Sequence, residues 1–118
     1  MKKERYENWV EMYIKAWNSN TPEDISAAFT EDGRYRTEPY AEAWQGHDEI
    51  IREWLDSKDE PGQTDFSYQV IAVEGDLGVV KGETTYRDPA AKYSNLWEIT
   101  LASDGRCADF VEWWMKQP

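Results

Sequence analysis

Residues 95–115, "NLWEITLASDGRCADFVEWWM", decide the fold class, because two segments with strand-like alternation meet at a short turn. Before the turn, large apolar side chains recur at every second residue, which is the spacing of a strand that buries one face. The "SDGR" segment at 103–106 contains the aspartate–glycine pair typical of a hairpin turn. The sequence therefore predicts an antiparallel hairpin with strands over 93–102 and 107–115.

The period of two continues upstream of this hairpin. We predict strands over 66–73 and 79–86, separated by the turn "EGDLG" and followed by the loop "RDPAAK". Ahead of them lie three helical patterns, with one early strand before the third helix. This order argues for an α+β fold, in which a curved antiparallel sheet packs against the helices. Because the chain has 118 residues and contains no repeat or linker, we expect residues 1–118 to form a single domain.

The first predicted helix is amphipathic. Its charged and polar residues, such as Glu7, Glu11 and Lys15, lie largely on one face, and its apolar residues lie on the other. We therefore expect this helix to cover one side of the sheet. The apolar stripe consists of Tyr6, Trp9, Val10, Tyr13, Ile14 and Trp17.

The second helix has a recognisable start. Thr21 suits the N-cap, and Pro22 suits the first helical position. We expect Gly33 to end this helix, because glycine readily adopts the left-handed conformation of a helix stop. A strand over 34–38 is then predicted, and Pro39 halts it.

After a loop over 40–46, the segment "GHDEIIREWLDSK" predicts a third helix. Asp48 and Glu49 lie in its first turn, where the helix dipole favours negative charge. The residues that these two helices are expected to bury are Ile25, Ala28 and Phe29 from the second and Ile50, Ile51, Trp54 and Leu55 from the third.

The composition makes several classes of function improbable. The net charge of −11, from 24 acidic and 13 basic residues, repels nucleic acid and anionic membranes, so we expect neither as a partner. The amino-terminal residues lack the apolar run of a secretory signal, and we expect a cytoplasmic protein. Cys107 and His47 are the single cysteine and histidine, so we expect no disulfide, no metal site and no cofactor. We interpret His47 as part of a helix start rather than as a base.

The order of the elements and several motifs resemble the nuclear transport factor 2-like superfamily. The motifs are "YIKAWNSNTPEDISAAFTEDGRY" (13–35), "YRTEP" (35–39), "WQGHDEIIREW" (44–54) and the closing hairpin quoted above. This superfamily has a cone-shaped fold and also contains ketosteroid isomerases and SnoaL-like polyketide cyclases. The chain is most similar to SnoaL-like domains whose function is not assigned.

The resemblance implies that the helices close the open end of a strongly bent sheet and leave a deep apolar cavity. It also implies a homodimer formed through the outer face of the sheet. The sequence adds support, because both faces of the last predicted strand carry large apolar residues, among them Trp113 and Trp114. The alternative is that one of these tryptophans packs beneath a loop.

The resemblance to ketosteroid isomerases implies two candidate catalytic residues. Tyr13 corresponds to a tyrosine that donates a hydrogen bond to the substrate, and Glu38, just before Pro39, lies close to their general-base aspartate. Their second donor is a carboxylic acid, and the corresponding residue here is Trp97, so the catalytic set is incomplete. The segment before Pro39 is one residue longer than theirs, so either Thr37 or Glu38 could face the cavity.

A Glu38 side chain desolvated by aromatic walls could move a proton adjacent to a carbonyl group, while Tyr13 stabilises the resulting enolate. The alternative for Glu38 is a carboxylate at the rim of the fold, paired with Arg34 or Arg36. The alternative for Tyr13 is a core residue whose hydroxyl group has one partner.

Aromatic residues are predicted to line the cavity, where they would suit a flat or apolar ligand; the alternative is that they are ordinary core residues. Asn95 lies on the same strand face as Trp97 and would place a polar group in this apolar space. The candidate ligand-binding residues are Trp9, Tyr13, Trp17, Tyr35, Trp44, Trp54, Asn95 and Trp97.

Three functions are compatible with the sequence. The first is the binding of a small apolar or aromatic molecule in the cavity. The second is a cofactor-free isomerase, cyclase or hydrolase that uses Glu38 and Tyr13. The third is a dimeric protein-interaction module whose cavity is filled by its own side chains.

Overall fold

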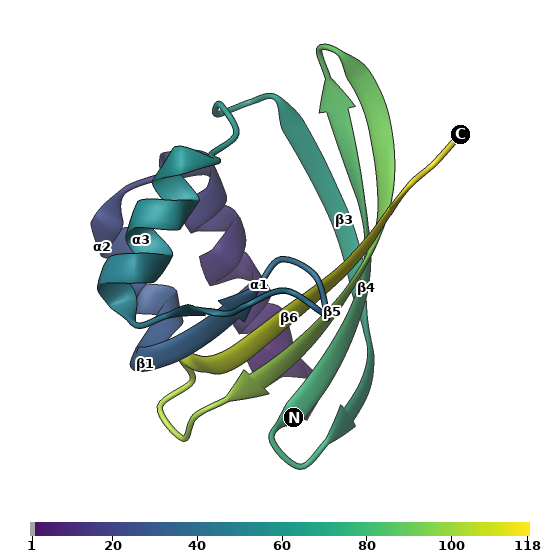
Figure 1. Cartoon of the computed structure of the whole chain (residues 1–118). Helices are drawn as coiled ribbons and strands as arrows, with labels where there is room; N and C mark the ends of the chain where they lie inside the picture. Colours follow the sequence, from purple (N-terminus) through teal and green to yellow (C-terminus); the bar gives the residue numbers. More distant parts are fainter. Residues whose placement is uncertain (1) are drawn as a thin grey trace.

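The computed structural model describes residues 2–118 and packs three helices against one face of a six-stranded sheet (Figure 1). The predicted α+β class and the bent, cone-like arrangement are confirmed. The helices are α1 (Lys2–Ser19), α2 (Pro22–Ala28) and α3 (His47–Asp56). The strands are β1 (Phe29–Arg36), β2 (Trp44–Gln45), β3 (Thr64–Glu74), β4 (Leu77–Arg87), β5 (Ala90–Leu101) and β6 (Cys107–Lys116).

The sheet is mixed, with the strand order β2-β1-β6-β5-β4-β3. The four carboxy-terminal strands form an antiparallel meander, and β1 joins its edge parallel to β6. The predicted closing hairpin is confirmed, with Leu101 opposite Cys107. Figure 1 shows this sheet curving around the helices, which all lie on its inner side. The inner face and the helices therefore enclose the apolar interior.

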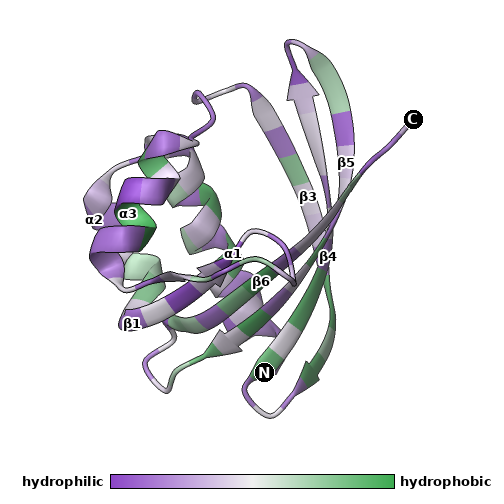
Figure 2. Cartoon of the chain, viewed as in Figure 1, coloured by the Kyte–Doolittle hydropathy of each residue, from purple (hydrophilic) through white to green (hydrophobic). Residues whose placement is uncertain are grey.

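The inner face is built by the alternation that the sequence contains. In Figure 2, hydrophobic and hydrophilic bands alternate along the long strands, and the hydrophobic positions of β5 and β6 supply much of the core. From α1, the predicted stripe is buried at Tyr6, Trp9, Val10 and Tyr13, whereas Ile14 and Trp17 are half-buried. The helix thus covers the sheet as the three-to-four residue spacing predicts.

The start of α2 agrees with the prediction, but its end does not. The Thr21 hydroxyl group accepts a hydrogen bond from the backbone N–H of Asp24 at 3.2 Å, as an N-cap does. The helix ends at Ala28, and β1 begins at Phe29, five residues before the predicted strand start at Arg34. The residues between Phe29 and Arg34 pair irregularly with β6, and this bulge conceals the strand in the sequence pattern.

Gly33 lies in this bulge instead of ending the helix. A Cβ atom at this position would lie 3.2 Å from the carbonyl oxygen of Cys107 in the neighbouring strand β6. Glycine therefore eases the close approach of two strands here and does not end a helix.

Two further predicted boundaries are wrong. The loop over 40–46 contains the short strand β2, because Trp44 and Gln45 pair with Tyr35 and Arg34 of β1. The loop over 87–92 is a tight turn, because Arg87 pairs directly with Ala90 and β5 starts there. Both differences arise from pairing between strands, which local composition does not reveal.

The described helices, which lie within residues 2–118, contain no segment long and apolar enough to cross a membrane. Within the same residues, no group of three or more His, Cys, Asp or Glu side chains is arranged to hold a metal ion.

Candidate functional site

A cavity of about 310 Å³ lies between the helices and the inner face of the sheet. Residues from α1, α3 and every strand except β3 line it, together with the segment that follows α3. Its walls are mainly aromatic. The aromatic lining residues are Tyr13, Trp17, Tyr35, Trp44, Trp54, Tyr86, Tyr93, Trp97 and Trp114.

The aromatic rings hold one another in place. Tyr35 stacks on Trp44 with their ring centroids 4.6 Å apart and the planes inclined by 8°. Tyr13 packs at 4.6 Å from Trp97 and at 5.1 Å from Trp54. These contacts tie α1, α3 and β2 to the sheet, so that the walls of the cavity are part of the core and are preorganised.

Two phenol groups form a buried pair in one wall. The hydroxyl oxygens of Tyr13 and Tyr35 are 2.8 Å apart, and either group can donate to the other. Burial raises the pKa of Tyr13 well above its usual value and also raises that of Tyr35. Both hydroxyl groups are therefore neutral in ordinary buffers, and each can donate or accept a hydrogen bond.

A chain of polar side chains crosses three strands of the inner face. Thr84 on β4 donates to the Asn95 side-chain oxygen at 2.7 Å, and Asn95 Nδ2 donates to Glu112 Oε2 at 2.8 Å. Trp97 Nε1 donates to the same Glu112 oxygen at 3.1 Å. Asn95 is thus held by side chains of its neighbouring strands.

Glu112 is the acidic residue at one end of this row of hydrogen-bonded side chains. Its Oε2 atom accepts both hydrogen bonds, and Oε1 has no protein partner among the described residues yet is not sealed from solvent. The pKa of Glu112 is raised, mainly because burial removes water from the carboxyl group. The hydrogen bonds from Trp97 and Asn95 lower the pKa in part, and the negative charges of Glu38 and Asp59 raise it further. The cavity therefore contains a carboxyl group with one oxygen free to meet a ligand.

Glu112 was not among the candidate residues from the sequence. The signal that could have found it is the alternation of the last strand, where Phe110, Glu112 and Trp114 share one face. An acid between two aromatic residues on the face that supplies the core should be buried with partners.

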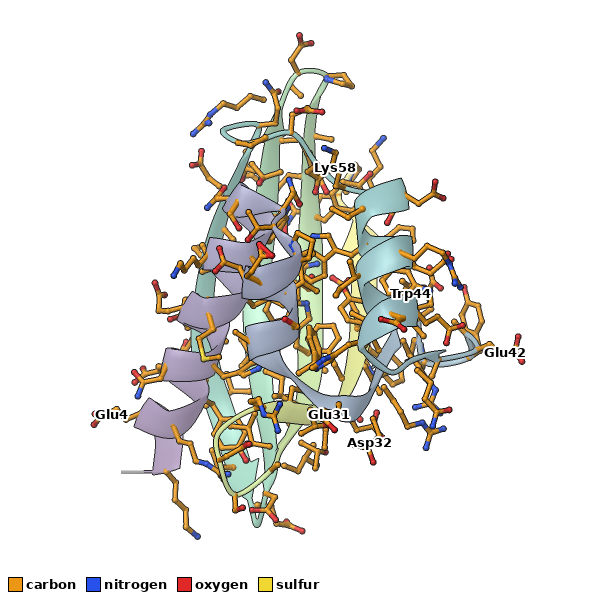
Figure 3. The ribbon with its side chains drawn as sticks, turned by 90° about the vertical axis from the view of Figure 1, so that its left-hand side faces the viewer. Glu4, Glu31, Asp32, Glu42, Trp44 and Lys58 are labelled. Atoms are coloured by element: carbon orange, nitrogen blue, oxygen red, sulfur yellow. The ribbon has the colours of Figure 1, made fainter. Side chains whose placement is uncertain are left out.

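A second acid, Asp59, lies in the cavity wall just after α3. Its Oδ2 atom accepts hydrogen bonds from Trp17 Nε1 at 2.9 Å and from the Tyr86 hydroxyl group at 3.3 Å. The neighbouring Lys58 also lines the cavity but is largely exposed, and Figure 3 shows it near the carboxy-terminal end of α3. Figure 3 also shows Glu31 and Asp32, in the first half of β1, at the opposite end of the molecule from Lys58.

Thr37, and not Glu38, lines the cavity. Because Tyr35 faces inward opposite Phe110 of β6, the residue two positions later faces the same way, and Glu38 points elsewhere. The carboxyl group of Glu38 accepts hydrogen bonds from Thr37 at 2.7 Å and from Trp114 Nε1 at 3.3 Å. This geometry does not place Glu38 where a base would meet a ligand in the cavity.

The ion pair expected for Glu38 is also absent from the described contacts. Arg36 instead pairs with Asp109 of β6, with 3.4 Å between Nη1 and Oδ1.

Of the candidate ligand-binding residues, Trp9 alone lies outside the cavity lining. It is 1% exposed, and its Nε1 atom donates to the Ala28 carbonyl oxygen at 2.7 Å, so it is a core residue that joins α1 to α2. His47, at the start of α3, contacts the Phe29 carbonyl oxygen at 2.8 Å through Nε2, which agrees with a structural position.

A second hollow, the outer groove, lies on the opposite face of the sheet. It has a volume of about 1060 Å³. Outward-facing residues of β3 to β6 form its floor, and the loop after β1 forms one side. Four of its large apolar side chains are exposed, namely Tyr40, Trp113, Trp114 and Met115.

Comparison with known families gives one match. Residues 10–114 match the sequence profile of the SnoaL-like domain, which is most of the chain. No curated protein sequence matches the chain significantly.

Solved structures share the fold at low sequence identity. A ketosteroid isomerase-like protein from Erwinia carotovora atroseptica is 19% identical with a TM-score of 0.70, covering 100% of this chain and 98% of that one. An NTF-2 like protein of unknown function from Burkholderia xenovorans is 12% identical with a TM-score of 0.74. The match covers 100% of this chain and 88% of that one. The epoxide hydrolase/cyclase-like enzyme SalBIII, which has a role in forming the pyran ring of salinomycin, is 14% identical with a TM-score of 0.75, covering 97% and 92%.

Proposed function

Because the chain belongs to the SnoaL-like domain family, we propose that it binds a small, flat and largely apolar molecule in the cavity between the helices and the sheet. The observation that carries this proposal is the preformed aromatic cavity of about 310 Å³. That volume is at the small end of ligand pockets, so the ligand should be compact.

The lining supports this ligand chemistry. Stacked rings such as Tyr35 and Trp44 offer apolar faces, while a few polar groups converge from different elements. Asn95, Glu112 and the phenol pair can fix the orientation of a ligand that carries a hydroxyl, carbonyl or amino group. The open cavity does not fit the third hypothesis, in which the chain's own side chains fill this space.

A thermal-shift screen against compact aromatic compounds tests the proposal, with hits measured by isothermal titration calorimetry. We expect saturable binding that raises the melting temperature, because a ligand that binds only the folded state stabilises it. Substitution of the half-buried Thr37 with tryptophan should narrow the cavity and abolish binding of these hits.

The matched control is Pro39→Trp. Pro39 is exposed, lies two residues from Thr37 and is not part of the cavity lining, so this variant should bind as the wild type does. Equal binding by Thr37→Trp, or the absence of any saturable ligand across a broad library, would contradict the proposal.

A second candidate function is proton transfer on the bound molecule. The specific observation is the desolvated carboxyl group of Glu112 in the same cavity as the Tyr13–Tyr35 phenol pair. In this scheme Glu112 takes the role of proton carrier that the sequence suggested for Glu38, and a phenol group stabilises charge on the ligand oxygen. Once a substrate is found, Glu112→Gln should abolish turnover while Glu38→Gln retains it; the reverse result would restore Glu38 as the base.

We also propose that the chain forms a homodimer through the outer groove. Exposed Trp113 and Met115 give this face a large apolar component, which is unusual for a surface that remains in water.

A further inference from the structure

We propose that the cavity selects organic cations, namely compact aromatic amines or quaternary ammonium compounds whose charge faces Glu112. This inference rests on the proposed binding function and adds the chemical class of the ligand. Two features carry it: the aromatic composition of the walls, and the excess of carboxyl groups over basic groups in the cavity.

The aromatic walls favour a cation. The face of a tryptophan or tyrosine ring carries partial negative charge, and a cation within about 6 Å of the ring centre is attracted to it. The cavity presents rings from several directions, including Trp17, Trp54 and Trp97. The attraction is strongest where water is excluded, and Trp54 and Trp97 are held in the core at 6% and 1% exposed.

The carboxyl groups supply the counter-charge. Glu112 and Asp59 each accept hydrogen bonds through one oxygen, from side chains of other elements, and leave the other oxygen without a protein partner among the described residues. Each side chain also lines the cavity. A bound primary, secondary or tertiary ammonium group could donate a charge-assisted hydrogen bond to one of these free oxygens. A quaternary ammonium group has no N–H and would form an ion pair instead.

Acidic residues outnumber basic residues in the cavity lining, which also favours a cationic ligand. Of the described lining residues, Lys58 is the one basic residue, and it is largely exposed at the rim. The other ionisable groups of the lining are the phenols of Tyr13, Tyr35, Tyr86 and Tyr93, the carboxyl group of Asp59, and Lys58. The charge of Glu38 acts on Glu112 from outside the lining. Mutual repulsion among the acids is relieved by a cation placed between them.

The probes for the test are three naphthalene compounds of similar shape. They are (1-naphthylmethyl)trimethylammonium, neutral 1-naphthylmethanol and anionic 1-naphthylacetate, each titrated into the full chain by calorimetry at neutral pH. We expect the ammonium compound to bind about tenfold or more tightly than the alcohol, and the carboxylate to show no measurable binding.

Glu112→Gln should remove most of this preference, because glutamine keeps the shape and an accepting oxygen but loses the charge. The matched control is Glu74→Gln, which removes the same charge from an exposed site at the end of β3 outside the cavity lining. This variant should retain the wild-type preference, and circular dichroism establishes that both variants fold.

The wild-type protein offers a second test that needs no substitution. The quaternary ammonium group keeps its charge at every pH, so its affinity should rise over the pH interval in which Glu112 ionises, which the raised pKa of Glu112 moves above the ordinary glutamate range. If protonated Glu112 instead donated a hydrogen bond to a neutral ligand, the affinity for the alcohol would fall over the same interval.

The outcomes separate the two proposals. If the alcohol binds as tightly as the ammonium compound, the preference for cations is wrong while the binding function stands. If none of the three probes binds, the inference about charge is overturned; the binding function fails with it only if the broad thermal-shift screen also finds no ligand.

Discussion

At the scale of single residues, Glu112 determines the electrostatics of the cavity. Its carboxyl group is held by Asn95 and Trp97, two residues that the sequence did place in the cavity. The same contacts explain why a tryptophan and an asparagine occupy the inner face of β5, since both donate to one acid on β6. Removal of the acid would therefore leave two donors without their shared partner.

The raised pKa of Glu112 predicts a specific dependence of stability on pH. Between the ordinary glutamate pKa of about 4.3 and the raised value, the folded protein holds a proton that the unfolded chain has released. This contribution to the free energy of unfolding is complete below the unfolded pKa and is lost as pH rises through the folded pKa. Glu112→Gln, which cannot ionise, should therefore gain stability relative to the wild type as pH increases.

Urea unfolding at a series of pH values measures this difference. The comparison with the variant is needed because Asp24, Glu83 and Asp104 have lowered pKa values, which give the opposite trend in the wild type. Glu74→Gln serves as the control and should differ from the wild type by a constant amount. A constant difference for Glu112→Gln as well would show that Glu112 titrates alike in both states.

At the scale of elements, a glycine in β4, Gly82, shapes the inner face of the sheet. A Cβ atom at Gly82 would lie 2.4 Å from Cζ of Phe66 on the neighbouring strand β3. Phe66 in turn stacks on Trp97 with ring centroids 4.7 Å apart and an interplanar angle of 13°. Gly82 thus provides the space in which Phe66 supports the tryptophan that lines the cavity.

We predict that Gly82→Ala lowers the free energy of unfolding by about 1–3 kcal/mol, because the new methyl group overpacks the ring of Phe66. Chemical denaturation measures the loss, and Lys81→Ala, at the neighbouring exposed position, should change stability by much less. In a Phe66→Leu background the Gly82→Ala substitution should cost less, since the clashing ring is gone. Equal costs in both backgrounds would remove Phe66 from the explanation.

The short helix α2 depends on its cap. Thr21→Ala removes the hydroxyl group that accepts from the Asp24 N–H and should lower the free energy of unfolding by about 1 kcal/mol. Thr21→Ser keeps an accepting hydroxyl group and should restore most of the loss in the same denaturation experiment. A serine variant as unstable as the alanine variant would assign the effect to the methyl group of Thr21.

At the scale of the whole molecule, apolar surface and net charge act in opposite directions on assembly. The outer groove exposes Trp113 and Met115, at 47% and 70%, which favours contact with a second copy. The net charge of −11 opposes the approach of two identical chains. The proposed dimer should therefore be sensitive to ionic strength.

We predict a dimer in sedimentation velocity at about 0.15 M salt, and weaker association at low salt, where the repulsion is less screened. Trp113→Glu should shift the protein to monomer, because it places a charge at the centre of the apolar face. Asn18→Glu adds the same charge on the exposed side of α1 and should leave the dimer intact. A monomeric wild type, or a dimeric Trp113→Glu variant, would contradict an interface in the outer groove.

The stripe of α1 and the closing hairpin could be predicted from residue spacing within one element, because helices and strands repeat every 3.6 and 2 residues. The cap at Thr21 could be predicted from residue type. The aromatic cavity was expected from the family resemblance and not from spacing. Trp9 was predicted to line the cavity but lies in the core, because apolar spacing along a helix does not distinguish core residues from residues that line a cavity.

The register between strands is set when distant segments pair, and several features of the site depend on it. The pairing of β1 with β6 made Phe29 the start of a strand and turned Thr37 inward in place of Glu38. The pairing of β5 with β6 brought Asn95 and Trp97 to Glu112. A shift of one residue in either register would reverse which side chains face the cavity, and residues distant in the chain fix that register together.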